Sequence, residues 1–89
     1  MKVMFFGYIR DITGTKETWM QGPTNLKQLL HKLCDIYGKN LKSRVFDNND
    51  IGREVIILIN GRNVAFTGGI ETALSEDDEI SIFPVMAGG

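Results

Sequence analysis

The spacing of apolar and polar residues changes several times along the chain, and each spacing predicts a different element. Residues 2–9 are rich in β-branched and aromatic side chains, and residues 16–21 form a second, shorter stretch of this kind. The intervening residues 11–15 have the composition of a loop. We therefore expect the chain to begin with a β-hairpin.

The spacing then lengthens to that of a helix between Thr24 and Tyr37. One stripe of this segment is apolar and the opposite stripe is polar, which predicts an amphipathic helix packed against a core. The Thr24 hydroxyl can accept a backbone N–H at the start, and Gly38 can adopt the left-handed conformation that ends a helix. The apolar stripe consists of Leu26, Leu29, Leu30, Leu33, Cys34 and Tyr37.

The second half of the chain returns to strand-like patterns. In residues 39–53, Leu41, Val45 and Phe46 could form one helical turn against the core, but residues 47–50 would break it, and we predict a long loop. Residues 55–59 are a short, continuous and largely β-branched apolar run, which predicts a central strand covered on both faces. An Asn-Gly pair follows, which favours a tight turn into an antiparallel strand at 62–64. After further loops, residues 79–83 are predicted to form the closing strand.

The predicted order is therefore β-β-α-β-β-β, with one helix for one sheet. This order indicates the α+β class and fits a β-grasp, a mixed sheet crossed by one helix. In such a sheet the first and last strands can lie side by side and parallel at the centre.

The alternation of side chains in these two strands assigns residues to the two faces of the sheet. If Lys2 faces solvent, Phe6 lies on the open face, and Phe83 of the closing strand lies on the same face. We expect these two aromatic residues to form a docking patch. The open face is also expected to carry Met4, Tyr8, Glu79 and Ser81, whereas Val3, Phe5, Ile9, Ile80 and Ile82 face the core.

Composition narrows the class of protein. Of the 89 residues, 43% are hydrophobic and 24% are charged, which predicts a single globular domain over residues 1–89 with residues 84–89 as its tail. Ten basic residues against eleven acidic ones give a net charge of -1, which argues against nucleic acid as a partner. The N-terminal sequence lacks a signal peptide's apolar core, and the single Cys34 suits a reducing compartment. We expect a cytoplasmic protein without a membrane partner.

The final residues predict the reactive group. Pro84 ends the closing strand, and no cap or turn follows it apart from two glycines, Gly88 and Gly89. This ending predicts a flexible tail with an unhindered α-carboxylate at Gly89. Glycines let a backbone pass through a narrow channel and leave the terminal carbonyl open to attack.

Three stretches carry a resemblance to a known family. They are Phe5-Phe6-Gly7-Tyr8-Ile9-Arg10-Asp11 with Gly14, Leu58-Ile59-Asn60-Gly61-Arg62, and Asp78-Glu79-Ile80-Ser81-Ile82-Phe83-Pro84-Val85-Met86-Ala87-Gly88-Gly89. Together they resemble the ubiquitin-like sulfur-carrier family, specifically the small subunit of molybdopterin synthase and related archaeal modifier proteins.

The resemblance implies a carrier subunit that is not an enzyme on its own. An E1-like enzyme would adenylate Gly89 with ATP and Mg, a sulfur donor would convert it to a thiocarboxylate, and the large subunit of molybdopterin synthase would receive the tail. This chain itself would bind no cofactor, and it contains neither a G-x-x-x-x-G-K-[ST] nor a G-x-G-x-x-G stretch. The expected partner-binding residues are Phe6, Phe83, Pro84, Val85, Met86 and Ala87.

Two alternatives remain open at this point. The same tail would serve a ubiquitin-like modifier that is joined through Gly89 to lysines of target proteins. An interaction domain with an inert terminus would use only the patch around Phe6 and Phe83.

Other candidate residues favour ordinary structural roles. Cys34 lies on the apolar stripe and is interpreted as a core residue, and His31 lies on the polar stripe as a solvated side chain. The acidic residues 76–79 are typical of a solvated turn. Residues 47–52 begin like a calcium loop, but Ile51 occupies a ligand position. We predict no metal site.

Overall fold

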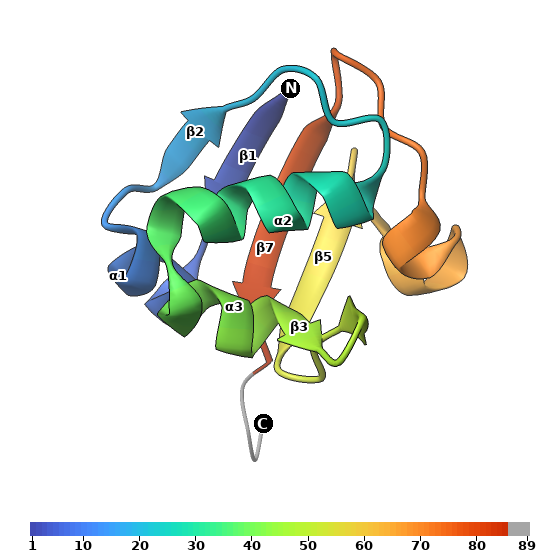
Figure 1. The fold of residues 1–89 in the computed structure, drawn as a ribbon. Helices are drawn as coiled ribbons and strands as arrows, with labels where there is room; N and C mark the ends of the chain where they lie inside the picture. The colour runs from blue at the N-terminus through green and yellow to red at the C-terminus, as the bar shows by residue number, and fades with distance from the viewer. Residues whose placement is uncertain (86–89) are drawn as a thin grey trace.

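The computed structural model describes residues 1–85. Within them, a five-stranded mixed sheet carries helices on one face (Figure 1). The last strand, β7 (Glu79–Pro84), lies at the centre and pairs parallel with β1 (Lys2–Phe5) and antiparallel with β5 (Val55–Ile59). This confirms the predicted pairing of the first and last strands. In spatial order the strands are β2 (Glu17–Trp19), β1 (Lys2–Phe5), β7 (Glu79–Pro84), β5 (Val55–Ile59) and β6 (Arg62–Asn63).

The predicted amphipathic helix is α2 (Leu26–Tyr37), which crosses the sheet. Its N-cap is Asn25, whose side-chain oxygen accepts the Gln28 backbone N–H at 2.9 Å. The prediction of Thr24 as the cap is therefore wrong by one residue. Thr24 instead donates its backbone N–H to the Gln28 side chain at 2.9 Å. Gly38 ends the helix as predicted, but its φ of 94° and ψ of -172° are not the left-handed helical conformation that was expected.

The predicted N-terminal hairpin contains a helix. β1 and β2 do pair antiparallel, but β1 ends at Phe5 and α1 (Gly7–Thr13) occupies part of the predicted strand and loop. Gly7 turns the chain out of the strand with a φ of 56°. The prediction that strand alternation puts Tyr8 on the open face is therefore wrong. Tyr8 lies on α1, where it is half-buried and packs against the core. Ile9 is buried as expected, but it reaches the core from a helix.

The segment predicted to be a long loop is also structured. It forms α3 (Lys39–Val45) followed by two short antiparallel strands, β3 (Phe46–Asp47) and β4 (Asp50–Ile51). Leu41 and Val45 lie four positions apart on α3 and are fully buried. A helix of seven residues with two buried apolar side chains is too short for a period to be recognised, which is why the loop prediction was wrong.

The prediction that β5 is covered on both faces is wrong as well. Val55, Ile57 and Ile59 are buried, but Ile56 is 39% exposed. The following turn matches its prediction, because Asn60 and Gly61 have φ values of 52° and 84°. The return strand β6 is shorter than predicted, and two 3₁₀ turns follow it, η1 (Val64–Phe66) and η2 (Gly69–Glu71).

The described residues share one hydrophobic core between the sheet and α2, α3 and α1. Val3, Phe5, Ile80 and Ile82 face this core, as the alternation predicted. The fold is therefore the predicted α+β β-grasp, with two more short helices than the single one expected. Among residues 1–85, no helix has both the length and the apolar character needed to cross a membrane. The fully buried side chains include Phe5, Ile9, Leu26, Leu29, Leu30, Leu33, Leu41, Ile57, Ile80 and Ile82.

Candidate docking face and tail base

The predicted aromatic pair forms on the face of the sheet that no described helix covers, called here the open face. The Phe6 backbone N–H donates to the Ile82 carbonyl at 3.1 Å and extends the parallel ladder one residue beyond β1. This brings the Phe6 ring onto the Phe83 ring, with centroids 4.2 Å apart and planes 8° from parallel. Both residues are half-buried. The assignment of the two side chains to one face is confirmed, whereas their role in docking stays a prediction.

Aliphatic residues extend this pair into a larger apolar surface. The sheet register places Ile56 beside Phe83, and Leu58 and Met4 on either side of Ser81. We call the set Met4, Phe6, Ile56, Leu58 and Phe83 the open-face patch. Sequence reasoning missed Ile56 and Leu58, because a continuous apolar run hides which alternate residues face outward.

Charged residues and an exposed tryptophan lie at the β2 edge of the open face. Trp19 is 70% exposed and lies opposite Lys2 in the register of β1 and β2. The Lys2 ammonium is 5.8 Å from the Trp19 ring centroid and 3.5 Å from a Glu17 carboxylate oxygen. An apolar centre with a charged rim is the common anatomy of a protein interface. Trp19 was not singled out from the sequence as a candidate docking residue.

The base of the tail lies next to the aromatic pair. Pro84 ends β7 and packs so closely on α1 that a β-carbon at Gly7 would be 2.7 Å from the Pro84 Cγ. The Val85 backbone N–H then donates to the Glu54 carbonyl at 2.8 Å. The chain therefore leaves the sheet at a fixed point. The predicted site residues Met86, Ala87, Gly88 and Gly89 lie outside the described residues, so their roles stay predictions.

Charged and aromatic side chains surround this base. A Glu54 carboxylate oxygen lies 2.6 Å from the Arg44 guanidinium. This hydrogen bond and the charge of the carboxylate raise the pKa of Arg44 above its ordinary value. The same guanidinium lies 5.1 Å from the Tyr8 ring centroid. The Tyr8 hydroxyl makes a long 3.5 Å contact, as donor, with the Glu54 carbonyl.

The remaining candidates have structural roles. Cys34 is buried, and this burial raises the pKa of its thiol to about 11, so it is not a thiolate nucleophile at neutral pH. His31 is exposed, with its ring 4.6 Å from that of Phe46. Within residues 1–85, no three His, Cys, Asp or Glu side chains lie close enough together to hold a metal ion.

The acidic turn organises the start of β7. The Asp78 carboxylate accepts the Ser75 backbone N–H at 2.7 Å and the Asn60 side-chain amide at 2.9 Å. The Asn60 side-chain oxygen accepts the Glu79 backbone N–H at 2.9 Å. These contacts join the acidic turn to the Asn-Gly turn and explain the carboxylate at position 78 without any catalytic role.

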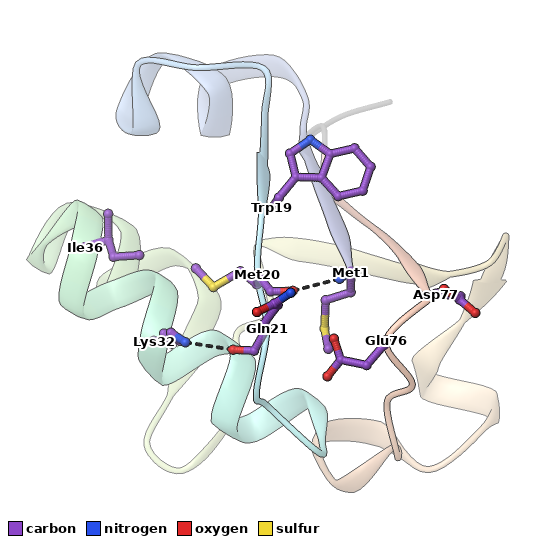
Figure 2. Close-up of a pocket in the computed structure, with 8 residues that line it drawn as sticks. All are labelled: Met1, Trp19, Met20, Gln21, Lys32, Ile36, Glu76 and Asp77. Carbon is purple, nitrogen blue, oxygen red and sulfur yellow. Dashed lines mark hydrogen bonds between the residues drawn. The ribbon is translucent and has the colours of Figure 1, made fainter.

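An open groove of about 770 Å³ lies at the opposite end of the sheet from Val85 (Figure 2). The N-terminal amine donates to the Met20 carbonyl at 2.7 Å, and Lys32 Nζ donates to the Gln21 carbonyl at 2.9 Å. These bonds pair the N-terminal amine and the Lys32 ammonium, and neither Pro84 nor Val85 lines the groove. It is lined by Met1, Trp19, Met20, Gln21, Lys32, Ile36, Glu76 and Asp77.

A β-grasp with an apolar open face beside the exit of its central strand defines a ubiquitin-like protein. The sequence profile described as the ThiS family matches residues 3–89, and the chain belongs to this family.

Individual relatives agree with this assignment. A putative sulfur carrier protein of Archaeoglobus fulgidus is 38% identical over 64 residues, which cover 72% of this chain and 73% of the relative. Small archaeal modifier protein 3 of Haloferax volcanii is 30% identical over 91 aligned residues, covering 100% of this chain and 98% of the relative. The solution structure of small archaeal modifier protein 1 from Methanosarcina acetivorans superposes with a TM-score of 0.86 at 35% identity, covering 99% of this chain and 94% of that one.

Proposed function

We propose that this protein is a sulfur carrier whose Gly89 carboxylate is adenylated, converted to a thiocarboxylate and used as a sulfur donor in molybdopterin synthesis. The observation that carries the proposal is the position of β7. This strand is held on both sides at the centre of the sheet and leads the chain out beside the open-face patch. Membership of the ThiS family and a relative named as a putative sulfur carrier support the same conclusion. The resemblance of residues 78–89 to the molybdopterin synthase small subunit supports the choice of pathway.

The proposed chemistry takes place in a partner's site. A carboxylate is a poor acyl donor, so an oxygen of Gly89 first attacks the α-phosphorus of ATP, with Mg, on an E1-like enzyme, and pyrophosphate leaves. A hydrosulfide equivalent from a sulfur donor then adds to the acyl carbon and AMP leaves. The resulting thiocarboxylate sulfur is the nucleophile that the large synthase subunit passes to its substrate, because thiolate sulfur is strongly nucleophilic.

The open-face patch supplies the binding energy that this arrangement requires. The five residues after Pro84 can reach at most about 17 Å, which is enough to enter a site while the folded part stays outside. Val85 is already bonded to Glu54, and ordering the four residues after it costs roughly 4–8 kcal/mol of backbone entropy. Contacts made by the tail alone must overcome that cost, whereas a preformed apolar face contributes binding without further ordering.

Mass spectrometry of the intact protein from its own cells tests the proposal. The expected result is a chain that ends at Gly89, with a fraction in which one oxygen is replaced by sulfur. A variant with one residue added after Gly89 should fold and bind its activating enzyme, yet form no adenylate. Full activation of that variant contradicts the proposal.

The second candidate function is that of a protein modifier joined through Gly89 to lysines. Two relatives named as small archaeal modifier proteins favour it specifically. Peptide mass spectrometry of cellular proteins distinguishes the two functions. Lysines linked to Gly89 support the modifier, and their absence together with a sulfur-containing terminus supports the carrier.

A further inference from the structure

The helices α1 and α3 and the end of β7 meet at Glu54, beside the point where the chain leaves the sheet. Glu54, in the connection between β4 and β5, accepts the Val85 N–H with its carbonyl and binds Arg44 of α3 with its carboxylate. Tyr8 of α1 lies under the Arg44 guanidinium and points its hydroxyl at the Glu54 carbonyl. In Figure 1, α1 and α3 lie at the end of the sheet where β7 ends.

This cluster explains what the segment 39–53 contributes beyond covering the core. Leu41 and Val45 anchor α3 in the core, which fixes the backbone that carries Arg44. The Gly52 N–H donates to the Val45 carbonyl at 2.7 Å, and a β-carbon at Gly52 would overlap the Arg44 carbonyl. The end of α3 and the chain leading to Glu54 are therefore packed directly against each other.

We propose that Tyr8, Arg44 and Glu54 form a clamp that sets the position and direction in which the chain leaves the sheet at Val85, and that they are positioning residues for activation of the tail. The inference rests on the proposed function. The clamp determines how the tail starts relative to the open-face patch. A partner that has bound the patch then finds the tail already directed into its site, and less ordering remains to be done on binding.

The clamp predicts a specific kinetic pattern. Arg44→Gln removes the ion pair and the guanidinium over Tyr8 but leaves the open-face patch unchanged. Docking is then unaffected, while fewer docked molecules present the tail correctly. We expect kcat for adenylation to fall about two- to fivefold with KM unchanged, in keeping with the modest strength of exposed ion pairs.

A second measurement reports on the clamp without any enzyme. Hydrogen exchange of the Val85 amide, followed by NMR, should become about two- to fivefold faster in Arg44→Gln. That amide is bonded to the backbone carbonyl of Glu54, and Arg44 holds the carboxylate of the same residue. The matched control is Arg53→Gln. It breaks the 3.2 Å ion pair between Arg53 and Asp47 in the same segment. Among the described residues, neither of these two side chains hydrogen-bonds to Arg44, Glu54 or Val85. This control should leave both kcat and Val85 exchange at wild-type values.

The outcomes separate the clamp from the proposed function. Faster exchange at Val85 with lower kcat in Arg44→Gln, and neither change in Arg53→Gln, supports the clamp. Unchanged Val85 exchange overturns it, and so does faster exchange with unchanged kcat. If wild-type protein is not adenylated by the activating enzyme, the proposed function fails, and Val85 exchange alone then decides whether the clamp exists.

Discussion

The contact between Gly7 and Pro84 allows a quantitative test of how the tail base is built. Gly7→Ala adds a single methyl group at the position where α1 begins and the last strand ends. The residue has a φ of 56°, and its new β-carbon would lie 2.7 Å from the Pro84 Cγ and 3.2 Å from the Pro84 Cδ. Both atoms belong to a ring that is fixed by β7 and cannot rotate away.

Two costs add in this variant. An alanine in the left-handed region costs about 1–2 kcal/mol, because its β-carbon approaches the following carbonyl. Overpacking against Pro84 adds about 1–3 kcal/mol. We therefore expect the free energy of unfolding to fall by about 2–5 kcal/mol. Gly69→Ala is the matched control, because Gly69 has a φ of 60° and nothing within 4 Å of the added carbon, so it carries the first cost alone.

Urea denaturation measures the difference between these two variants. With a slope of about 1 kcal/mol per molar urea, Gly7→Ala should unfold at a midpoint about 1–3 M below that of Gly69→Ala. In a Pro84→Ala background the ring is gone, and the cost of Gly7→Ala should fall to the control level. Equal midpoints for the two glycine variants in the wild-type background would refute the argument that α1 and the end of β7 are in close contact.

Three further results are expected. Leu33→Ala should lower the free energy of unfolding by about 2–5 kcal/mol, because it leaves a cavity in the core. Ile36→Ala, at a residue 57% exposed, should cost under about 1 kcal/mol. Equal losses in a denaturation experiment would contradict the burial of the Leu33 face of α2. The pKa of Cys34 is raised from 9.0 to about 11, so the unfolded chain loses this proton first. The contribution of this thiol to stability should therefore be complete below pH 9 and fall between pH 9 and about pH 11 by at most about 1.4 kcal/mol per pH unit, a slope that Cys34→Ala should remove. Phe83→Ala should weaken binding of the activating enzyme about tenfold or more in a calorimetric titration. Phe66→Ala, at an aromatic residue 87% exposed on η1, should leave the affinity unchanged. Equal affinities of the two variants for the enzyme would exclude the open-face patch as the docking site.

Two features of the proposed docking region are already formed in the described structure. The stacked rings of Phe6 and Phe83 are in place without a partner, and so is the hydrogen bond between Val85 and Glu54. A partner that docked as proposed would meet a preformed surface and a fixed point of departure for the tail. This favours recognition in which the folded face binds first and the tail enters the site afterwards.

Local patterns in the sequence were sufficient for much of the fold. The apolar stripe from Leu26 to Tyr37 has the helical period over about three turns. Its members up to Cys34 are buried and Tyr37 is half-buried. The Asn60-Gly61 pair has a conformational preference of its own, independent of its surroundings. Alternation in the first and last strands correctly placed Phe6 and Phe83 on one face, because the side-chain period of a strand is fixed by its backbone.

Other features depended on contacts between distant segments. Residues 7–9 look like a continuation of the first strand and residues 11–13 like part of a loop, but a glycine with a φ of 56° and the packing of Ile9 make them one helix. The run from Val55 to Ile59 is uniformly apolar, so only the placement of every described helix on one side of the sheet decides that Ile56 is exposed.

The tail base shows the same division between sequence and tertiary structure. The sequence by itself predicted that a strand ends at Pro84 and is followed by a glycine-rich ending, because proline and glycine act through their own backbone preferences. That Tyr8, Arg44 and Glu54 surround Val85 was decided only by the tertiary structure. These residues are up to 77 positions from Val85 in the sequence, and no local preference connects them; they meet because the β-grasp core brings α1, α3 and the start of β5 to the end of β7.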